Sequence, residues 1–475
     1  MTPLRRLTLL ALASCIVVAA EAQVMSLREV VDRAVEQSLT VDAARQQVTG
    51  ARVNQRESEL SRYPTLALQN SGGYQFGLNV DPTTNLLERQ TIGFLNFSLD
   101  ASATLYAGGR INNTIAQNRA SVAAAEADLA ASEQDVALQA AQLYLEALLA
   151  REAQDNAATL RDQAAAQLRV LNARIEAGAL APVQRFELES TVARQEQRVI
   201  AAENAARLAR LRLAQLLRLP PDDELRLATA ETLDFDAVLL PEVTAAELYA
   251  AALERQPSVR AARLGEEAAA LGVDVARAGY YPTLSVFGQA NTRYSSQAVD
   301  PVFDGTETVE EQRVVLNGQE VTFGIPRQNV TLVERPLTDQ LSDFFGQAVG
   351  LSLRVPIFQQ GRNDAAVGRA RNLAEQARTR REQAELELRT QTEQALLNAV
   401  NARAEVAAAR RALNAAQASY DAAVRRAEFG AGNDFDLTDQ QLLLEQAQNA
   451  LLQARYQYVF NAKVVDFYLG RPLEL

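Results

Sequence analysis

The sequence contains no histidine and a single cysteine, Cys15, among its 475 residues. Without these side chains an exported chain has no cysteine nucleophile, no serine and histidine catalytic pair, no zinc site with soft ligands and no histidine to bind haem. A chain that loses Cys15 also cannot form disulfide bonds. We therefore expect neither an enzyme nor a bound cofactor. The formal net charge of −12 argues against nucleic acid as a partner.

Residues 1–22 have the pattern of a secretory signal peptide. Two arginines precede an apolar run over 7–20, and small residues ending at Ala22 offer a cleavage site. A membrane anchor is the weaker alternative because the run is too short to span a bilayer. The box "LASC" ending at Cys15 also looks like the site of a lipid-modified cysteine. Because the apolar run continues past Cys15, we expect cleavage after Ala22 and export.

Long hydrophobic runs are missing beyond residue 22. No later stretch reaches the roughly 20 apolar residues of a transmembrane helix, so a membrane-spanning part must consist of strands. Residues 65–80 and 95–105 alternate between apolar and small polar residues, as in a strand with two different faces. The same alternation returns at 283–289 and 349–357. We predict four strands, each long enough to cross a bilayer.

The chain carries the same segments twice. "RYPTLALQ" at 62–69 returns as "YYPTLSVFG" at 280–288, and "LYAGGR" at 105–110 returns as "IFQQGR" at 357–362. Because each offset holds without gaps over a long stretch, we interpret the chain as two copies of one unit. The predicted parts are a signal peptide at 1–22, a first helix-strand-strand-helix repeat at 23–219, a linker at 220–243 and a second repeat at 244–475.

Two arrangements of the four strands are open. In the first arrangement they form a sandwich sheet with one solvent-exposed face, although four isolated strands between very long helices have no second sheet to pack on. In the second they belong to a barrel. Four strands cannot close a barrel, which needs about eight or more, so several chains must then share one.

The remainder of each copy is predicted to be helix. Residues 110–174 contain no proline and are rich in alanine, leucine, glutamine, glutamate and arginine, and 362–426 have the same character. At about 1.5 Å per residue each makes a helix on the order of 95 Å long. Apolar residues recur every seven positions from Val122 to Leu143, a coiled-coil spacing. Shorter helices are expected at 26–62, 183–217, 244–280 and 437–469.

Glycine and proline stand where these helices must end. Gly178 is predicted to turn the chain after the first long helix, and Gly430 with Gly432 after the second. Pro64 and Pro282 mark the junctions where a short helix gives way to a strand. The expected result is a wall of antiparallel helices, in which each long helix lies beside two stacked short ones.

The second copy has 34 extra residues between its strands, and they are acidic and loop-like. Within them, 314–323 is predicted to form a hairpin around Asn317 and Gly318, a pair that favours a tight turn between strands. A long loop at one end of a barrel is typical of the outer-surface side of bacterial barrels.

These features together resemble the outer-membrane efflux proteins of the TolC type. The resemblance covers nearly the whole exported chain: "YPTL" before each first strand, "GGR" and "QGR" after each second strand, and "ARYQYVFNAKVVDFYLG" at 454–470. It implies an α+β membrane protein, a homotrimer that shares one 12-stranded outer-membrane β-barrel with four strands per chain. A long α-helical coiled-coil barrel would continue it into the periplasm.

The resemblance also implies a function. Proteins of this family serve as the exit duct of tripartite efflux pumps or type I secretion systems. They are passive export channels, joined to a periplasmic adaptor protein and to an inner-membrane pump or ATP-driven transporter. No nucleotide or cofactor drives them. We therefore expect a channel that lies in outer-membrane lipid and extends into the periplasm.

Alignment with the family places an acidic periplasmic gate on Asp436 and Asp439. A spacing of three puts both carboxylates on one face of a helix, and threefold symmetry would gather six of them at a constriction that attracts cations. The simpler alternative is that Asp436 caps the N-terminus of that helix. The first copy has Gln184 and Glu187 at the equivalent positions, so the acidic ring would come from the second copy alone.

The resemblance is incomplete at the tip, and one other class of protein competes with it. Ala427 and Gly432 stand where the best-known member has a tyrosine and an arginine that help fasten the closed tip. The main rival is a structural protein, either a periplasmic coiled-coil adaptor or a trimeric surface fibre. An adaptor should have lipoyl-like and sandwich modules around a single helical hairpin, and a fibre should have short repeats without a barrel. The two hairpins and paired amphipathic strands of this chain favour the channel.

Overall fold

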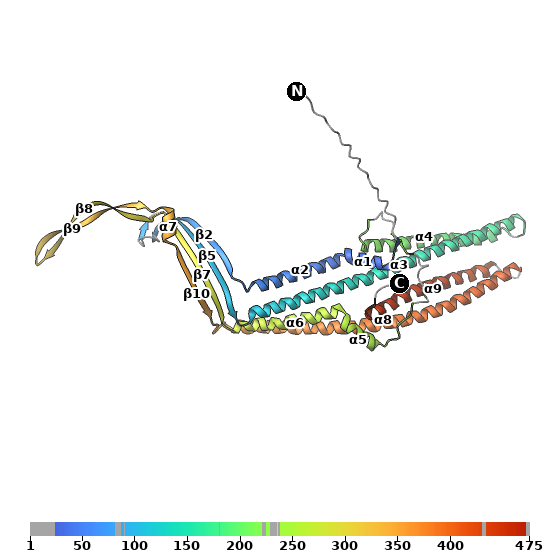
Figure 1. Cartoon of the computed structure of the whole chain (residues 1–475). Helices are drawn as coiled ribbons and strands as arrows, with labels where there is room; N and C mark the ends of the chain where they lie inside the picture. Colours follow the sequence, from blue (N-terminus) through green and yellow to red (C-terminus); the bar gives the residue numbers. More distant parts are fainter. Residues whose placement is uncertain are drawn as a thin grey trace, which may run out of the picture. The chain divides into compact units, whose positions relative to one another are not determined.

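The chain divides into two compact units, and each draws on both halves of the sequence. The predicted signal peptide, with Cys15, lies outside the residues that the structure describes. The computed structural model describes residues 24–80, 87–89, 91–179, 181–220, 225–228, 235, 238–429 and 434–471, and the longer elements are labelled in Figure 1. A helical unit contains the described residues within Met1–Ala51, Ser121–Glu266 and Gln376–Leu475, and a sheet unit contains those within Arg52–Ala120 and Glu267–Glu375.

Two helices of 67 residues each, α3 (Arg110–Glu176) and α8 (Arg362–Glu428), confirm the two long helices that the sequence predicts. At about 1.5 Å per residue each is roughly 100 Å long. The shorter α4 (Gln184–Leu216) and α9 (Asp434–Tyr468) also lie where they are expected. Strong helix formers fill all four, and no proline interrupts them. Among the described residues, none of the helices combines the length and the hydropathy that a membrane crossing requires.

The prediction of single continuous helices at 26–62 and 244–280 is wrong, because each segment is divided. The first forms α1 (Leu27–Gln37) and α2 (Leu39–Leu60), and the second forms α5 (Ala245–Arg255), α6 (Pro257–Arg277) and the short 3-10 helix η2 (Ala278–Tyr280).

The two breaks occupy equivalent positions when the two copies are aligned on Pro64 and Pro282. They fall at Ser38 and Gln256, both of which have extended backbone conformations. Pro257 keeps the residue before it out of the helical region, which explains the second break. In the first copy the Ser38 hydroxyl accepts a hydrogen bond from the Val41 amide at 3.4 Å, so it caps the start of a new helix.

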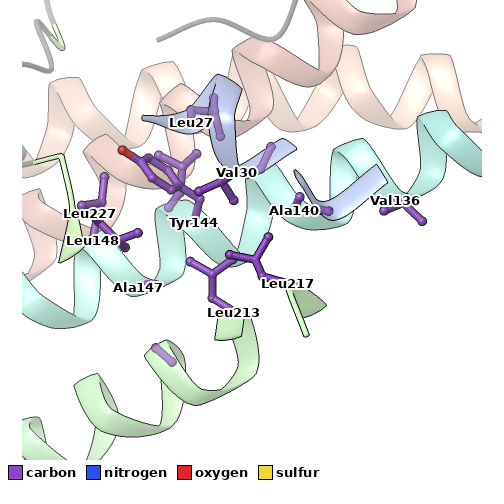
Figure 2. Close-up of a cluster of buried hydrophobic side chains, with 14 of the residues drawn as sticks. Leu27, Val30, Val136, Ala140, Tyr144, Ala147, Leu148, Leu213, Leu217 and Leu227 are labelled. Carbon is purple, nitrogen blue, oxygen red and sulfur yellow. The ribbon is translucent and has the colours of Figure 1, made fainter. Parts of the chain in front are cut away.

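The core of the helical unit gathers side chains from α1, α3 and α4 (Figure 2). Val30, Tyr144 and Leu213 are all buried there. A short parallel pair of strands, β1 (Val24–Met25) and β6 (Arg226–Leu227), adds Leu227 to the same cluster. Full burial of each large apolar side chain contributes about 1.5 to 3 kcal/mol, so this cluster holds the helices of the first copy side by side.

The sheet unit contains a four-stranded antiparallel sheet in the order β10-β7-β5-β2. The inner pair, β5 and β7, joins a strand of the first copy to a strand of the second. The two outer strands, β2 and β10, have one unpaired edge each within this sheet. The four strands confirm the prediction of two per copy: β2 (Thr65–Gln75), β5 (Ile92–Ala107), β7 (Thr283–Ser295) and β10 (Gly346–Arg354).

Two strands end earlier than predicted. The first strand ends at Gln75 instead of residue 80, because Gly77 adopts a φ of 110° that no regular strand accommodates. The chain then enters a small hairpin of β3 (Leu78–Val80) and β4 (Leu87–Arg89). The last strand ends at Arg354 instead of residue 357, since Pro356 cannot donate a hydrogen bond to the sheet.

The register gives this sheet one apolar and one polar face. Leu66, Ala101, Gly288 and Val349 lie side by side across the four strands and project from one face. A nearby row on the opposite face is polar or small: Gln69, Ser98, Asn291 and Gly346. Large side chains of the apolar face are exposed, namely Leu66, Leu68, Leu95, Leu99, Val349, Leu351 and Leu353. The predicted alternation is therefore confirmed.

The extra segment of the second copy is a two-stranded ribbon of β8 (Val299–Leu316) and β9 (Gln319–Glu334), labelled in Figure 1. Asn317 and Gly318 have φ angles of 53° and 84°, as in a type I′ turn, so the predicted hairpin is confirmed. The expectation that the rest is a loop is wrong. Valine, threonine, phenylalanine and isoleucine alternate with the acidic residues, and these favour strand. The helix α7 (Leu337–Asp343) then leads to β10.

Candidate functional site

The long helix α3 ends at Glu176, and the turn that follows contains Gly178, one of the predicted tip residues. Gly178 has a φ of 76°, and its amide donates to the Ile175 carbonyl at 2.9 Å. The next amide, of Ala179, donates to the Arg174 carbonyl at 2.9 Å. This Schellman arrangement satisfies the last carbonyls of the helix. A Cβ at Gly178 would meet nothing within 4 Å, so the turn requires glycine for its backbone conformation alone.

The second tip lies partly outside the described residues. The helix α8 ends at Glu428 and α9 begins at Asp434. Gly430 and Gly432, both predicted turn residues, fall between them and outside the described part of the chain, as does the side chain of Ala427. The roles assigned to these three residues stay predictions.

The two predicted gate residues lie near the start of α9. Asp436 and Asp439 are three residues apart on this helix, so its backbone places them on one face. The Asp439 side chain is exposed, and that of Asp436 lies outside the described part. Because α9 begins at Asp434, the helix boundary puts Asp436 in the first turn and not at the capping position. A carboxylate in the first turn still lies near the positive end of the helix dipole.

The equivalent positions of the first copy lie at the start of α4. Gln184 is the first residue of α4, and its side-chain oxygen is buried without a hydrogen-bond partner. Glu187 is exposed in the first turn. Next to them Arg185 pairs with Glu189 at 2.9 Å. The first copy therefore presents one carboxylate at the positions where the second copy presents two.

A buried polar cluster that the sequence did not predict joins α4 to α9. Glu445, about three turns into α9, is only 6% exposed, and so is Gln195 of α4. The Gln195 side-chain amide donates to one carboxylate oxygen of Glu445 at 3.0 Å. The guanidinium of Arg198 donates to the other. A buried carboxylate is tolerated when it is paired and hydrogen-bonded in this way, so the cluster fixes the two helices to each other.

One pattern in the sequence does mark this cluster. Glu445 follows three consecutive leucines on α9, while Ala193 stands at the equivalent position of α4. A charged residue inside an apolar stripe indicates a buried partner. The identity of that partner could not be read from the sequence, because Arg198 lies 247 residues away.

Two further hydrogen bonds join α3 to α9. The Tyr456 hydroxyl donates to Glu152 at 2.8 Å, and the Asn156 side-chain amide donates to Asn449 at 3.0 Å. Burial, and then the hydrogen bond to Glu152, raise the pKa of Tyr456, so its hydroxyl keeps the proton that it donates. The last helix of the second copy is thus tied to the long helix of the first.

A cavity of about 650 Å³ lies between α3, α8 and α9. Its lining combines small alanines with polar side chains such as Glu146, Glu405 and Gln453. Elsewhere too, the described residues include no group of three histidine, cysteine, aspartate or glutamate side chains placed to hold a metal ion. The cavity is bounded by side chains of three neighbouring helices.

The two predicted junction residues lie directly before strands of the sheet unit. Pro64 precedes β2 and Pro282 precedes β7. Proline has no amide to donate to the ladder, which suits the residue before a strand. Beside the second junction Tyr281 packs closely on Gly108, where an added Cβ would lie 2.5 Å from the tyrosine Cβ. This contact holds the turn after β5 against the start of β7.

The same junction contact is built from different residues in the two copies. In the first, the Arg62 guanidinium donates to the Asn112 side chain at 2.9 Å. In the second, the Tyr280 hydroxyl donates to Asp364. Alignment of the repeated segments makes Tyr280 equivalent to Arg62, and Asp364 equivalent to Asn112. Each contact ties the end of a short helix to the first turn of a long one.

The sequence matches the model of one protein family, described as outer membrane efflux protein, over residues 30–217 and again over 248–471. This chain belongs to the outer membrane efflux protein family. The two segments that match the efflux protein model cover most of the sequence and fall within the two predicted repeats. No match was found among curated proteins.

Solved structures of outer-membrane channels share the fold of this efflux family member. CusC has a TM-score of 0.75 at 18% identity, over 94% of this chain and 92% of that chain. The CmeC channel of Campylobacter jejuni has a TM-score of 0.74 at 16% identity, over 94% and 85%. The MtrE channel of Neisseria gonorrhoeae has a TM-score of 0.71 at 19% identity, over 94% and 89%. At these identities the likeness shows the fold.

Membership of the outer membrane efflux protein family confirms the predicted fold class and location. The chain is a subunit of a trimeric channel, in which four strands per chain contribute to a shared outer-membrane barrel and the long helices extend into the periplasm. The family is one of efflux channels and not of periplasmic adaptors, so the rival prediction is set aside.

Proposed function

We propose that this protein is the outer-membrane exit duct of a tripartite efflux pump or a type I secretion system, a passive export channel gated at its periplasmic end. One observation carries the proposal. The four-stranded sheet exposes a continuous apolar face, from Leu66 on one edge strand to Val349 on the other. A soluble sheet would cover such a face with a second layer.

The length of the strands suits a bilayer. Strands of 9 to 16 residues are long enough to cross the hydrocarbon core when tilted, since about 9 to 11 residues suffice. The opposite, polar face would then line a water-filled passage. Four strands cannot close on themselves, and the unpaired edges of β2 and β10 support closure with the other two subunits of the trimer.

The long helices support a periplasmic passage. Each of α3 and α8 is roughly 100 Å long, several times the thickness of a bilayer, and each is the next helix after a strand of the sheet, β5 for α3 and β10 for α8. Their far ends, at Gly178 and after Glu428, are the natural points of contact with a periplasmic adaptor protein. The adaptor and an inner-membrane pump or ATP-driven transporter would supply cargo and energy.

The gate assignment rests on position. Asp436 and Asp439 share one face of α9 close to its N-terminus, and α4 has only Glu187 in place of the pair. In a trimer the six carboxylates would form a ring near the tip, where they would attract cations and exclude anions. The bonds of α9 to α4 and α3 would make this helix move as part of a rigid group.

The internal duplication is part of the same proposal. Residues 23–219 and 244–475 are interpreted as two copies joined by the linker 220–243. Recurring details support this interpretation. Ser26 with Glu29, and Thr244 with Glu247, form the same capping box at equivalent positions of the two copies. Two copies in each of three chains give the helical barrel a pseudo-sixfold wall, which departs from that symmetry where the gate residues differ.

Single-channel recording in planar bilayers tests the gate. The double variant Asp436→Ala with Asp439→Ala should lose block by divalent cations and show a changed conductance, because the acidic ring is gone. Glu187→Ala is the matched control, since it removes one carboxylate at the equivalent tip position of the first copy. Its conductance and cation block should stay close to those of the wild type. An unchanged double variant would show that the gate lies elsewhere.

A photo-crosslinking amino acid tests the adaptor. Ala179 is exposed in the turn after α3, so a crosslinker there should capture a periplasmic protein in whole cells. The control position is Leu208, which is exposed near the other end of α4, far from the turn. Capture at both positions, or at neither, would contradict docking at the helical tips.

A further inference from the structure

The ribbon of β8 and β9 leaves nearly all of its 34 strand residues exposed within one subunit. A two-stranded ribbon of this kind is at best marginally stable in water when nothing packs on it. Exposed apolar side chains along a ribbon also favour aggregation. We therefore expect another surface of the assembled protein to cover a ribbon of this length.

The base of the ribbon is firmly held. Gln340 of α7 is 1% exposed; it accepts a hydrogen bond from the Ser295 amide and donates one to the Arg335 carbonyl, both at 2.9 Å. Arg335, at the end of β9, pairs with Asp300 at the start of β8 and with Asp343 of α7 at 3.4 Å. These contacts fix the direction in which the ribbon leaves the sheet, so the base of the ribbon is an ordered part of the fold.

The outer half of the ribbon has one apolar face. Val314 pairs with Val321 across the ladder, and Phe323 and Ile325 continue the same face, because side chains two residues apart on a strand project together. We call this surface the apolar ribbon face. Its members are between 37% and 57% exposed in one subunit: Val314, Leu316, Val321, Phe323 and Ile325.

The opposite face of the same half carries most of the charge, together with two exposed valines, Val309 and Val315. The side chains of Glu307, Glu311, Arg313 and Glu320 alternate with those of the apolar ribbon face along the two strands. This face suits water. This half of the ribbon is thus amphipathic: most of its large apolar side chains lie on the apolar ribbon face, and most of its acidic side chains lie on the other.

The connectivity of the sheet indicates what covers it. The ribbon leads through α7 into β10, which is an edge strand of the four-stranded sheet. In the trimeric barrel an edge strand lies where two subunits meet, so each ribbon rises beside a subunit boundary on the same rim. Two charged residues lie at the inner end of the apolar ribbon face, Glu310 across from Ile325 and Arg327 two residues beyond it, and their charges are neutralised because they pair with each other at 2.9 Å. Like charges therefore do not keep three copies apart at this point.

We propose that the apolar ribbon faces of the three subunits pack against one another outside the mouth of the barrel, where they form a three-ribbon bundle on the cell surface. The occupant of each face is the same ribbon in the other subunits. This inference rests on the trimeric channel and goes beyond it, since it assigns the ribbon a role in narrowing the outer exit. Cargo would leave between the ribbon bases.

Cysteine crosslinking tests the bundle, because the exported chain has no cysteine of its own if Cys15 leaves with the signal peptide. Gln312 lies across from Phe323 on the apolar ribbon face, and its neighbour Arg313 lies on the charged face. Both are exposed and neither belongs to the apolar cluster, so Gln312→Cys and Arg313→Cys form a matched pair. Intact cells expressing each variant are treated with a mild oxidant and with a membrane-impermeant maleimide.

The bundle predicts opposite results for the two variants. Gln312→Cys should give a disulfide-linked band at twice the monomer mass on a denaturing gel, whereas Arg313→Cys should stay monomeric and react with the maleimide. Equal crosslinking of both variants, or none for Gln312→Cys, would overturn the bundle. An Arg313→Cys variant that resists the maleimide in intact cells would also overturn it, because the ribbon would then not lie at the surface.

An unheated gel separates this inference from the proposed function. If the trimer is present and only the crosslink is missing, the channel stands and the bundle fails. If the trimer itself is missing, the shared barrel fails and the bundle fails with it.

Discussion

The side-chain amide of Gln195 on α4 lies 3.0 Å from the carboxylate of Glu445 on α9, and both side chains are buried. The contact joins the first copy to the second within one subunit. It also joins the helix that carries Glu187 to the helix that carries Asp436 and Asp439. A movement of one tip helix that separates Gln195 from Glu445 would leave buried polar groups unpaired, so the pair resists independent movement of the two tips.

Glu445→Ala should destabilise the helical unit by about 1 to 3 kcal/mol, because it leaves the Gln195 amide without its acceptor. Glu445→Gln keeps an acceptor and should cost less. Thermal unfolding of the detergent-solubilised protein, followed by circular dichroism, measures both. Glu187→Ala removes an exposed carboxylate and serves as the control, with little expected change. Equal stability of Glu445→Ala and Glu187→Ala would show that the cluster does not hold the helices together.

Gly178→Ala should cost about 1 kcal/mol, because a side chain at a φ of 76° is strained even with free space around it. Gly265→Ala is the matched control. Gly265 lies inside α6, also with nothing within 4 Å of its Cβ position, and alanine favours helix there by up to about 1 kcal/mol. The two variants should therefore shift the unfolding temperature in opposite directions. A gain of stability from Gly178→Ala would contradict the cap geometry.

Tyr456→Phe should destabilise the protein by about 1.5 to 3 kcal/mol, since it removes a hydrogen bond to the Glu152 carboxylate from a buried site. Tyr468→Phe is the comparison. The Tyr468 hydroxyl lies 3.4 Å from the Gln391 side chain and makes a weaker hydrogen bond. Its removal should shift the unfolding temperature much less. Equal effects of the two variants would mean that the bond between α3 and α9 contributes nothing specific.

The two capping boxes predict a dependence of stability on pH. Glu29 accepts from the Ser26 amide, and Glu247 from the Thr244 amide, both at 2.8 Å. These backbone hydrogen bonds lower the pKa of both carboxyl groups below their usual 4.5. A lowered pKa in the folded state means that the ionised form stabilises the fold. The contribution is complete above pH 4.5 and is lost as the pH falls through the lower, folded-state values.

A double variant, Glu29→Gln with Glu247→Gln, removes this charge and keeps an acceptor. The wild type should unfold at a higher temperature than the variant at pH 7, and the difference should shrink as the pH falls toward 3. Glu57→Gln, at an exposed position of α2, is the control and should give a smaller difference across the same range. A difference that grows on acidification would contradict the predicted sign.

The sequence alone predicts those parts of the fold that follow from local periodicity. The long helices, the four strands and the tight turn at Asn317 and Gly318 all follow from residue spacing and turn chemistry. The break at Ser38 was missed because a serine inside a helical pattern is tolerated. Only the recurrence of the break at Gln256, before Pro257, shows that it belongs to both copies.

The candidate site was predictable only in part. Spacing on α9 places Asp436 and Asp439 on one face, as the sequence indicates. The pairing of Glu445 with Gln195 and Arg198 could not be predicted, because side chains about 250 residues apart meet only when the two copies pack. The strand content of the ribbon could not be predicted for a different reason. Its acidic residues lower the mean hydropathy of a segment whose remaining residues favour strand.

The most direct test of the central claim is the stoichiometry and location of the protein in cells. Membranes are separated by density, the protein is extracted from the outer-membrane fraction in detergent, and native mass spectrometry counts the chains in each particle. The account predicts a particle of three chains that comes from the outer membrane. A monomer recovered from the soluble periplasmic fraction would contradict the shared barrel and with it the exit duct.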